Sequence, residues 1–292
     1  MNKVVQISIL AKISGNVNAD ESVGTRITLK KMYSSDGSVL PFVSARAIKH
    51  AIREALKDRG YQIDPFRLEG DQLNDSGDPE KYIDNDLFGY LTTQKGKRKG
   101  EGGAKSRQAP IALSYLKAIY DTPISTEFAA RFPRDENQEN PVPFEIEVAE
   151  FIGRLNAIIY DYLGKKGPGK EEKNFELPQK EREKRLKDFL EIFLTPSYVL
   201  PRRTNSLNVP EYIVGLVVLS ENGPKPIYQY LDYEVEEKEL KVKEEKLNQL
   251  IKITEKSKCF LINYNNAILP QTNFEIKDVK EAIDEIIKFY FS

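Results

Sequence analysis

Residues 43–58 read VSARAIKHAIREALKD and predict a helix that begins after Ser44 and ends near Arg59, just before Gly60. The Ser44 hydroxyl is suited to cap the first turn, where backbone amides lack partners inside the helix. At about 100° per residue, one sector of this helix is apolar and carries Ala45, Ile48, Ile52, Ala55 and Leu56. We therefore expect this side to pack on a sheet.

The same helix has a separate cationic sector, also about 100° wide, which carries Arg46, Lys49, His50, Arg53 and Lys57. The two acids of the segment, Glu54 and Asp58, lie outside that sector. A solvated helix face would also be charged. However, cations that recur about every 5.4 Å match the phosphate spacing of a single strand and can follow a backbone without reading its sequence.

The segments around this helix predict a mixed α+β fold. Alternating apolar residues over 5–13 indicate a half-buried strand, and the helix is preceded by a short extended piece at 39–43. Strands are then expected within 111–132 and 144–148. A helix is expected from Pro178 to Thr195, with an apolar stripe of Leu186, Phe189, Leu190 and Phe193, and a strand at 212–219. This strand, helix, strands, helix, strand order is that of a ferredoxin-like βαββαβ sheet. A helix near 243–257, a strand near 259–264 and a last helix follow.

Residues 60–109 interrupt this pattern and are interpreted as an insertion. Residues 64–86 hold eight acids and two bases, whereas 95–107 hold six bases, one acid and several glycines. The glycines predict a mobile loop in the second part. That loop, including Arg107, is either disordered or orders on a nucleic acid.

Composition excludes several classes of protein. Lys and Arg (44) almost balance Asp and Glu (45), so net charge gives no argument for nucleic acid. One cysteine, Cys259, and one histidine, His50, rule out a disulfide framework and a zinc site built from Cys or His. No apolar run is long enough to span a bilayer, and no cofactor-binding motif is present. We expect a cytoplasmic protein that needs no metal or other cofactor.

Two further loops are candidates for binding. The loop at 15–20 contributes Asn16 and Asn18, and the proline-framed loop at 196–210 contributes Arg202 and Arg203. Each is either an ordinary turn or surface loop, or a set of donors for phosphates.

Catalysis is the competing interpretation. His50 is a potential general acid or base, and Asp20 with Glu21 a potential metal site. No Tyr, Ser or second His accompanies His50 at a useful spacing, and two adjacent acids are common by chance. Cys259 fits the role of a small apolar side chain. We predict that the protein is not an enzyme, and the alternative is a metal-dependent or His-dependent endoribonuclease.

Four segments of the chain stand out together: Asn16-Val17-Asn18-Ala19-Asp20, the helix from Val43 to Arg53, Asp84-Asn85-Asp86-Leu87-Phe88-Gly89-Tyr90, and Leu200-Pro201-Arg202-Arg203-Thr204-Asn205. In this order they resemble segments of the DevR-like backbone subunits of CRISPR type I effector (Cascade) complexes. The sequence departs from the family pattern at Ala45, Arg46 and His50, where the family has serine, glutamine and arginine, but the helix stays cationic.

The resemblance implies an RRM-like palm formed by residues 1–59 and 110–292, a helical fingers insertion at 60–109, and a thumb hairpin within about 115–145. It also implies a non-catalytic subunit that binds guide RNA (crRNA) and lines it in several copies as a filament. The subunit would support pairing of the guide with target DNA, beside other Cascade subunits and away from any membrane. The alternative is an endoribonuclease that acts on CRISPR RNA or target RNA. The expected RNA-binding residues are Asn16, Asn18, Ser44, Arg46, Lys49, His50, Arg53, Lys57, Arg107, Arg202 and Arg203.

Overall fold

The computed structural model describes most of the chain. The described residues are 3–16, 19–69, 72–94, 103–133, 140–170, 174–201, 207–237, 239–254, 256–264, 269–270 and 273–292.

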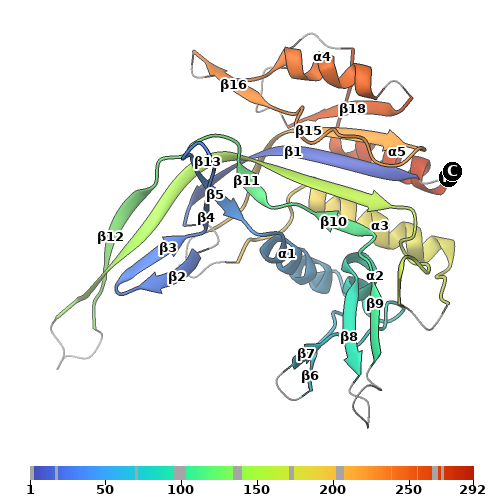
Figure 1. The fold of residues 1–292 in the computed structure, drawn as a ribbon, viewed down its shortest axis with the longest axis horizontal. Helices are drawn as coiled ribbons and strands as arrows, with labels where there is room; N and C mark the ends of the chain where they lie inside the picture. The colour runs from blue at the N-terminus through green and yellow to red at the C-terminus, as the bar shows by residue number, and fades with distance from the viewer. Residues whose placement is uncertain are drawn as a thin grey trace.

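A large mixed sheet forms the centre of the molecule (Figure 1). Its middle strand, β1 (Val4–Gly15), pairs antiparallel with β13 (Val142–Tyr160) on one side and β15 (Glu211–Ser220) on the other. Beyond β15 lie β18 (Lys258–Asn263) and β19 (Glu275–Lys277). Beyond β13 lie β10 (Ile111–Leu113), β11 (Leu116–Ala118), β5 (Val39–Val43) and β4 (Lys31–Tyr33).

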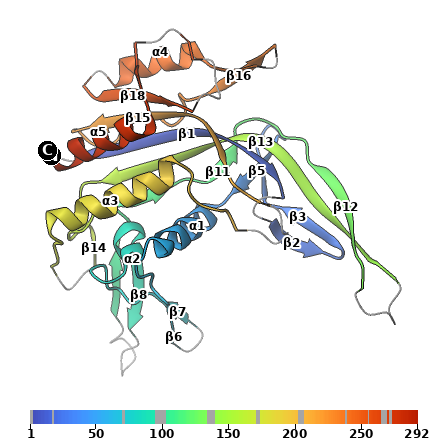
Figure 2. The same cartoon turned by 180° about the vertical axis from the view of Figure 1, so that it is seen from behind.

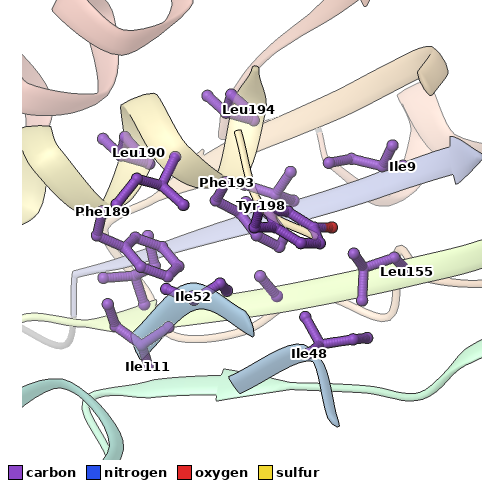
Figure 3. Close-up of a cluster of buried hydrophobic side chains, with 14 of the residues drawn as sticks. Ile9, Ile48, Ile52, Ile111, Leu155, Phe189, Leu190, Phe193, Leu194 and Tyr198 are labelled. Atoms are coloured by element: carbon purple, nitrogen blue, oxygen red, sulfur yellow. The ribbon is translucent and has the colours of Figure 1, made fainter. Parts of the chain in front are cut away.

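Three helices contribute to the core on one face of this sheet: α1 (Ala45–Asp58), α3 (Gln179–Leu194) and α5 (Val279–Phe291). The alternate β1 side chains from Val5 to Ile13 point into this core, as the sequence pattern predicts. Figure 3 shows Ile48 and Ile52 of α1 packed with Phe189, Leu190 and Phe193 of α3. The expected apolar stripe of α3 is fully buried, which confirms that prediction.

The other face of the sheet is covered over β15 and β18. There α4 (Glu244–Ile253) and the hairpin of β16 (Tyr233–Glu236) and β17 (Glu239–Val242) enclose a second apolar cluster around Leu216, Leu247 and Leu261. Figures 1 and 2 show α4 and β16 on the opposite side of β1 from α1 and α3. No helix in the described part of the chain is long and apolar enough to cross a membrane.

A long hairpin extends away from the sheet (Figure 1). It is formed by β12 (Ser125–Arg131) and the outer part of β13, with Ser125 opposite Val148 and Arg131 opposite Val142. β3 (Arg26–Leu29) pairs parallel with β13, and β2 (Ala19–Val23) pairs with β3. β2 thus begins at Ala19, inside the segment 15–20 that was predicted as a loop.

Residues 60–109 form small elements beside α1 (Figure 2). They are the hairpin of β6 (Arg67–Glu69) and β7 (Gln72–Asn74), the short α2 (Ile83–Phe88), and the pair β8 (Tyr90–Gln94) and β9 (Gly103–Arg107). β14 (Gly169–Lys170) adds to β9. The prediction of a loop up to residue 107 was wrong for 103–107, which are paired strand, while 95–102 lie outside the described residues.

Candidate nucleic-acid interface

The apolar side of α1 docks on the core as the sequence predicts. Ile48, Ile52 and Leu56 are fully buried, and the Ser44 hydroxyl accepts a hydrogen bond of 3.2 Å from the Ala47 amide. Ser44 therefore caps the helix. The far end is fixed by Arg59, which pairs with Asp188 and Glu191 of α3 at 2.9 and 2.6 Å. Both ends of α1 are thus held by contacts that do not use its cationic side.

The predicted cationic sector is present, and we call it the α1 cationic face (Arg46, Lys49, His50, Arg53 and Lys57). Arg46, His50 and Lys57 are exposed, whereas Lys49 and Arg53 are half-buried. These last two lie over the ring of Phe88, each with its charged group 5.3 Å from the ring centroid. Phe88 comes from the Leu87-Phe88-Gly89 segment, so α2 supplies the floor beneath the two cations.

Arg53 is held by a buried acid. Its Nε donates to Asp84 Oδ2 at 3.0 Å, and the Asp84 side chain is 1% exposed. The other carboxylate oxygen of Asp84 accepts the amide of Asp64 at 3.0 Å. This pair orients the guanidinium and leaves it partly exposed, with further donors for an anion.

Lys49 has no carboxylate partner among the described residues. Burial lowers the pKa of Lys49, and repulsion from Arg53 lowers it further. A cation in this position is stabilised when an anion approaches, because the anion favours the charged form. The α1 cationic face is therefore suited to a ligand with several negative charges, such as a phosphate backbone.

The floor of this site is a network of buried acids. Asp84, Asn85 and Asp86 of α2 are almost completely buried, as is Asp64. Asp64 accepts hydrogen bonds from the Asn85 side chain at 2.8 Å and from the Ser76 amide at 2.7 Å. The resemblance singled out Asp84-Asn85-Asp86, but nothing in the sequence indicated that these side chains face inward.

The burial of Arg107 contradicts the prediction that its side chain binds RNA. Its side chain is 0% exposed, and its Nη2 donates to Asp86 Oδ1 at 2.8 Å and to the carbonyl of Tyr162 at 3.0 Å. Arg185 of α3 contacts the other oxygen of Asp86 at 3.0 Å. The positive charge in a glycine-rich segment predicted an exposed side chain that binds RNA. In the structure Arg107 is instead buried, because it pairs with the buried carboxylate of Asp86 on α2.

Asn16, another residue predicted to bind RNA, is buried and connects two strands. It is 2% exposed, and its Nδ2 donates to the carbonyl of Glu147 at 2.7 Å, which links the end of β1 to β13. Asn208 donates to the Asn16 carbonyl at 3.5 Å, so the segments after β1 and before β15 meet here. Asn18, Arg202 and Arg203 lie outside the described residues, and so do the side chains of Asp20 and Glu21.

The structure thus brings five of the predicted residues together on α1 and buries Arg107 and Asn16 elsewhere. Two residues that shape the site were not among the candidates: Asp84, which orients Arg53, and Phe88, which supports both cations. Their proximity to the helix depends on how residues 60–109 fold back, which local sequence patterns do not reveal.

Comparison with solved structures supports the fold. A chain of a "CRISPR RNA-guided surveillance complex" matches with a TM-score of 0.61 at 13% identity, covering 98% of both chains. A chain of a "CRISPR RNA-guided surveillance complex, pre-nicking" matches with a TM-score of 0.62 at 11% identity, covering 99% of this chain and 100% of that one. No curated protein matches by sequence.

Sequence comparison identifies a family. The family of the CRISPR-associated negative auto-regulator DevR/Csa2 matches residues 76–222. This range is just over half of the chain and includes α2, the β12–β13 hairpin, α3 and β15, while α1 precedes it. The chain therefore belongs to the DevR/Csa2 family of CRISPR-associated proteins.

Proposed function

We propose that this protein is a non-catalytic backbone subunit of a CRISPR type I interference complex and binds guide RNA along the α1 cationic face. The observation that carries the proposal is that two cations lie side by side on α1. Lys49 has no carboxylate partner in the described part of the chain, and Arg53 is oriented by Asp84. Family membership and the likeness to chains of RNA-guided surveillance complexes support the same assignment.

The sheet topology is consistent with an RRM-like palm. The order β15-β1-β13-β11, with α1 between β1 and β11 in the chain and α3 between β13 and β15, follows a βαββαβ arrangement. In this proposal residues 1–59 and 110–292 form the palm and residues 60–109 the fingers. The β12–β13 hairpin, whose paired residues run from Ser125 to Val148, would be the thumb that was expected within about 115–145.

We further infer that several copies line one guide as a filament, beside other subunits of the complex and in the cytoplasm, and that the guide pairs with target DNA. Exposed apolar side chains on the hairpin support contact with a neighbouring subunit. Phe128 and Val142 are 72% and 61% exposed, respectively. Large apolar side chains exposed on one protruding element favour a protein contact there.

The first test is RNA binding by the purified protein. We expect it to carry RNA or to assemble on it, with an affinity that falls steeply as salt concentration rises. Lys49→Ala with Lys57→Ala should weaken binding for every guide sequence alike, because phosphates carry no sequence information. The control pair is Lys241→Ala with Lys243→Ala, near α4 on the opposite side of the sheet. Equal losses from both pairs, or a preference for duplex DNA, would contradict a specific RNA face.

The second test is cleavage. His50 makes no hydrogen bond to another described residue that would orient its imidazole for proton transfer. We expect bound RNA to remain intact with magnesium, and His50→Ala to change nothing. Magnesium-dependent cutting that disappears in Asp20→Ala would instead establish the endoribonuclease alternative.

A further inference from the structure

A groove lies on the face of the sheet opposite α1, where β13, β11, β5 and β4 run side by side. The loop that follows β15 forms its other wall, and its volume is about 770 Å³. Among its described lining residues there are two cations and no acid. This groove takes no part in the site on α1.

The two cations are direct neighbours across strands. Lys117 of β11 pairs with Arg154 of β13 in the antiparallel register, so their side chains leave the same face of the sheet side by side. Like charges in that arrangement repel each other and destabilise the sheet. Neither residue forms an ion pair with a carboxylate within the described parts of the chain. A bound anion between them would remove this repulsion.

Arg154 is also incompletely satisfied. Its Nη1 donates to the carbonyl of Tyr228 at 2.6 Å, but its buried Nε has no hydrogen-bond partner among the described residues. Burial lowers the pKa of Arg154, and the nearby charge of Asp232 offsets only part of this effect.

Aromatic and amide side chains complete the groove. Tyr115, which is 46% exposed, packs against Phe42 at 5.2 Å between ring centroids, and Tyr228 lies on the opposite wall. Asn156 and Gln229 add amide groups. Cations next to aromatic rings are the combination that binds single-stranded nucleic acid, in which phosphates meet the charges and bases stack on the rings.

We propose that this groove is a second nucleic-acid site, which binds a single strand through Lys117 and Arg154 to its phosphates and through Tyr115 or Tyr228 to its bases. An acidic peptide would satisfy the cations but would leave the rings and amides without matching groups. The groove is separate from the α1 cationic face and does not depend on it.

The test uses a short oligouridine that contains 4-thiouridine, added to the full-length protein after removal of co-purified RNA. Photo-crosslinking and mass spectrometry should locate adducts on peptides that cover 111–119 and 226–229. The variant Tyr115→Ala with Lys117→Ala should reduce these adducts and weaken binding on the order of tenfold, in a background where Lys49→Ala with Lys57→Ala has removed the contribution of α1. Both side chains are exposed enough for this variant to keep its fold, which a melting curve verifies.

The matched control is Tyr33→Ala with Lys288→Ala, an exposed tyrosine and an exposed lysine outside the groove. Equal losses in test and control variants would overturn the proposal, as would adducts confined to other segments. Displacement of the strand by a glutamate-rich peptide that binds the groove more tightly would assign it to a protein partner instead. If the groove variant leaves RNA binding unchanged while the α1 variant still weakens it, the groove proposal is refuted and the proposed function is not affected.

Discussion

Arg53→Ala and Lys49→Ala should weaken RNA binding to similar extents but should differ in their effect on stability. Arg53 is 20% exposed, and its partner Asp84 is 1% exposed, so removal of the guanidinium leaves a buried carboxylate without its cation. Loss of one partner of a fully buried pair costs about 3–5 kcal/mol. Because Arg53 is partly exposed and Asp84 keeps the Asp64 amide, we expect about 2–3 kcal/mol for Arg53→Ala.

Lys49→Ala should cost much less. Its ammonium interacts with the Phe88 ring, which contributes about 0.5–1 kcal/mol at partly exposed sites. Its removal also relieves repulsion of Arg53. The two effects oppose each other, so the free energy of unfolding should change by less than about 0.5 kcal/mol.

Urea denaturation of the RNA-free protein measures both values, and a salt titration measures binding. Each lost phosphate contact should reduce the slope of log K against log salt by about 0.7 for a single strand. A double-mutant cycle with Asp84→Asn then isolates the coupling of Arg53 to Asp84, which should be about 1–3 kcal/mol. Equal stabilities of the two single variants, or no coupling in the cycle, would refute the role given to Asp84. Unchanged RNA binding in both would refute the assignment of the face.

Three other perturbations test the polar interior and the backbone around the site. Asp86→Asn should lower the free energy of unfolding by about 3–5 kcal/mol because it leaves two buried guanidinium groups without their shared anion, and a loss below about 1 kcal/mol in urea denaturation would contradict this. Gly89→Ala should lower the melting temperature more than Gly24→Ala does, since φ is +71° and a Cβ at Gly89 would lie 2.4 Å from a backbone oxygen, whereas nothing lies within 4 Å at Gly24. Burial raises the pKa of Glu147, but hydrogen bonds from the Leu29 amide and from Lys31 more than offset this, so the pKa is lowered from 4.5. The stabilisation from Glu147 is therefore complete above pH 4.5 and should be lost as pH falls below that value. Glu147→Gln should reduce this loss of stability at acid pH in urea denaturation, and an unchanged pH dependence would show that other carboxylates cause it.

The sequence predicted those elements whose side chains repeat with a clear period. The apolar and cationic sectors of α1, its cap at Ser44 and the buried stripe of α3 all follow from residue spacing, and the structure confirms them. β13 was predicted only as 144–148, because half-buried polar residues such as Arg154 and Asn156 interrupt its apolar pattern on one face. Its length of 19 residues follows from pairing with several strands, which no local pattern reveals.

Charge was a less reliable guide, because a side chain's charge does not show where its partner lies. Arg107 was assigned to a mobile loop, but Asp86, 21 residues away in sequence, brings it into the core. The six-residue α2 has too few residues to show a helical period, and its acids would ordinarily face solvent. Only the packing of residues 60–109 against α1 and α3 places these acids beside arginines.

That packing gives the acidic half of the insertion a function for the site. Asp84 uses one donor of Arg53, and Asp86 is shared by Arg107 and Arg185, so the buried acids hold cations in place without neutralising all of them. The charged groups of Lys49 and Arg53 both lie over the ring of Phe88, which follows these acids on α2. If RNA binds the α1 cationic face, it binds only the state in which the insertion is docked, and ligand binding to one state stabilises that state. Binding of RNA and docking of residues 60–109 must therefore be thermodynamically coupled, so hydrogen exchange in α2 should slow when RNA is added and should no longer respond to RNA when Asp84 is replaced by asparagine.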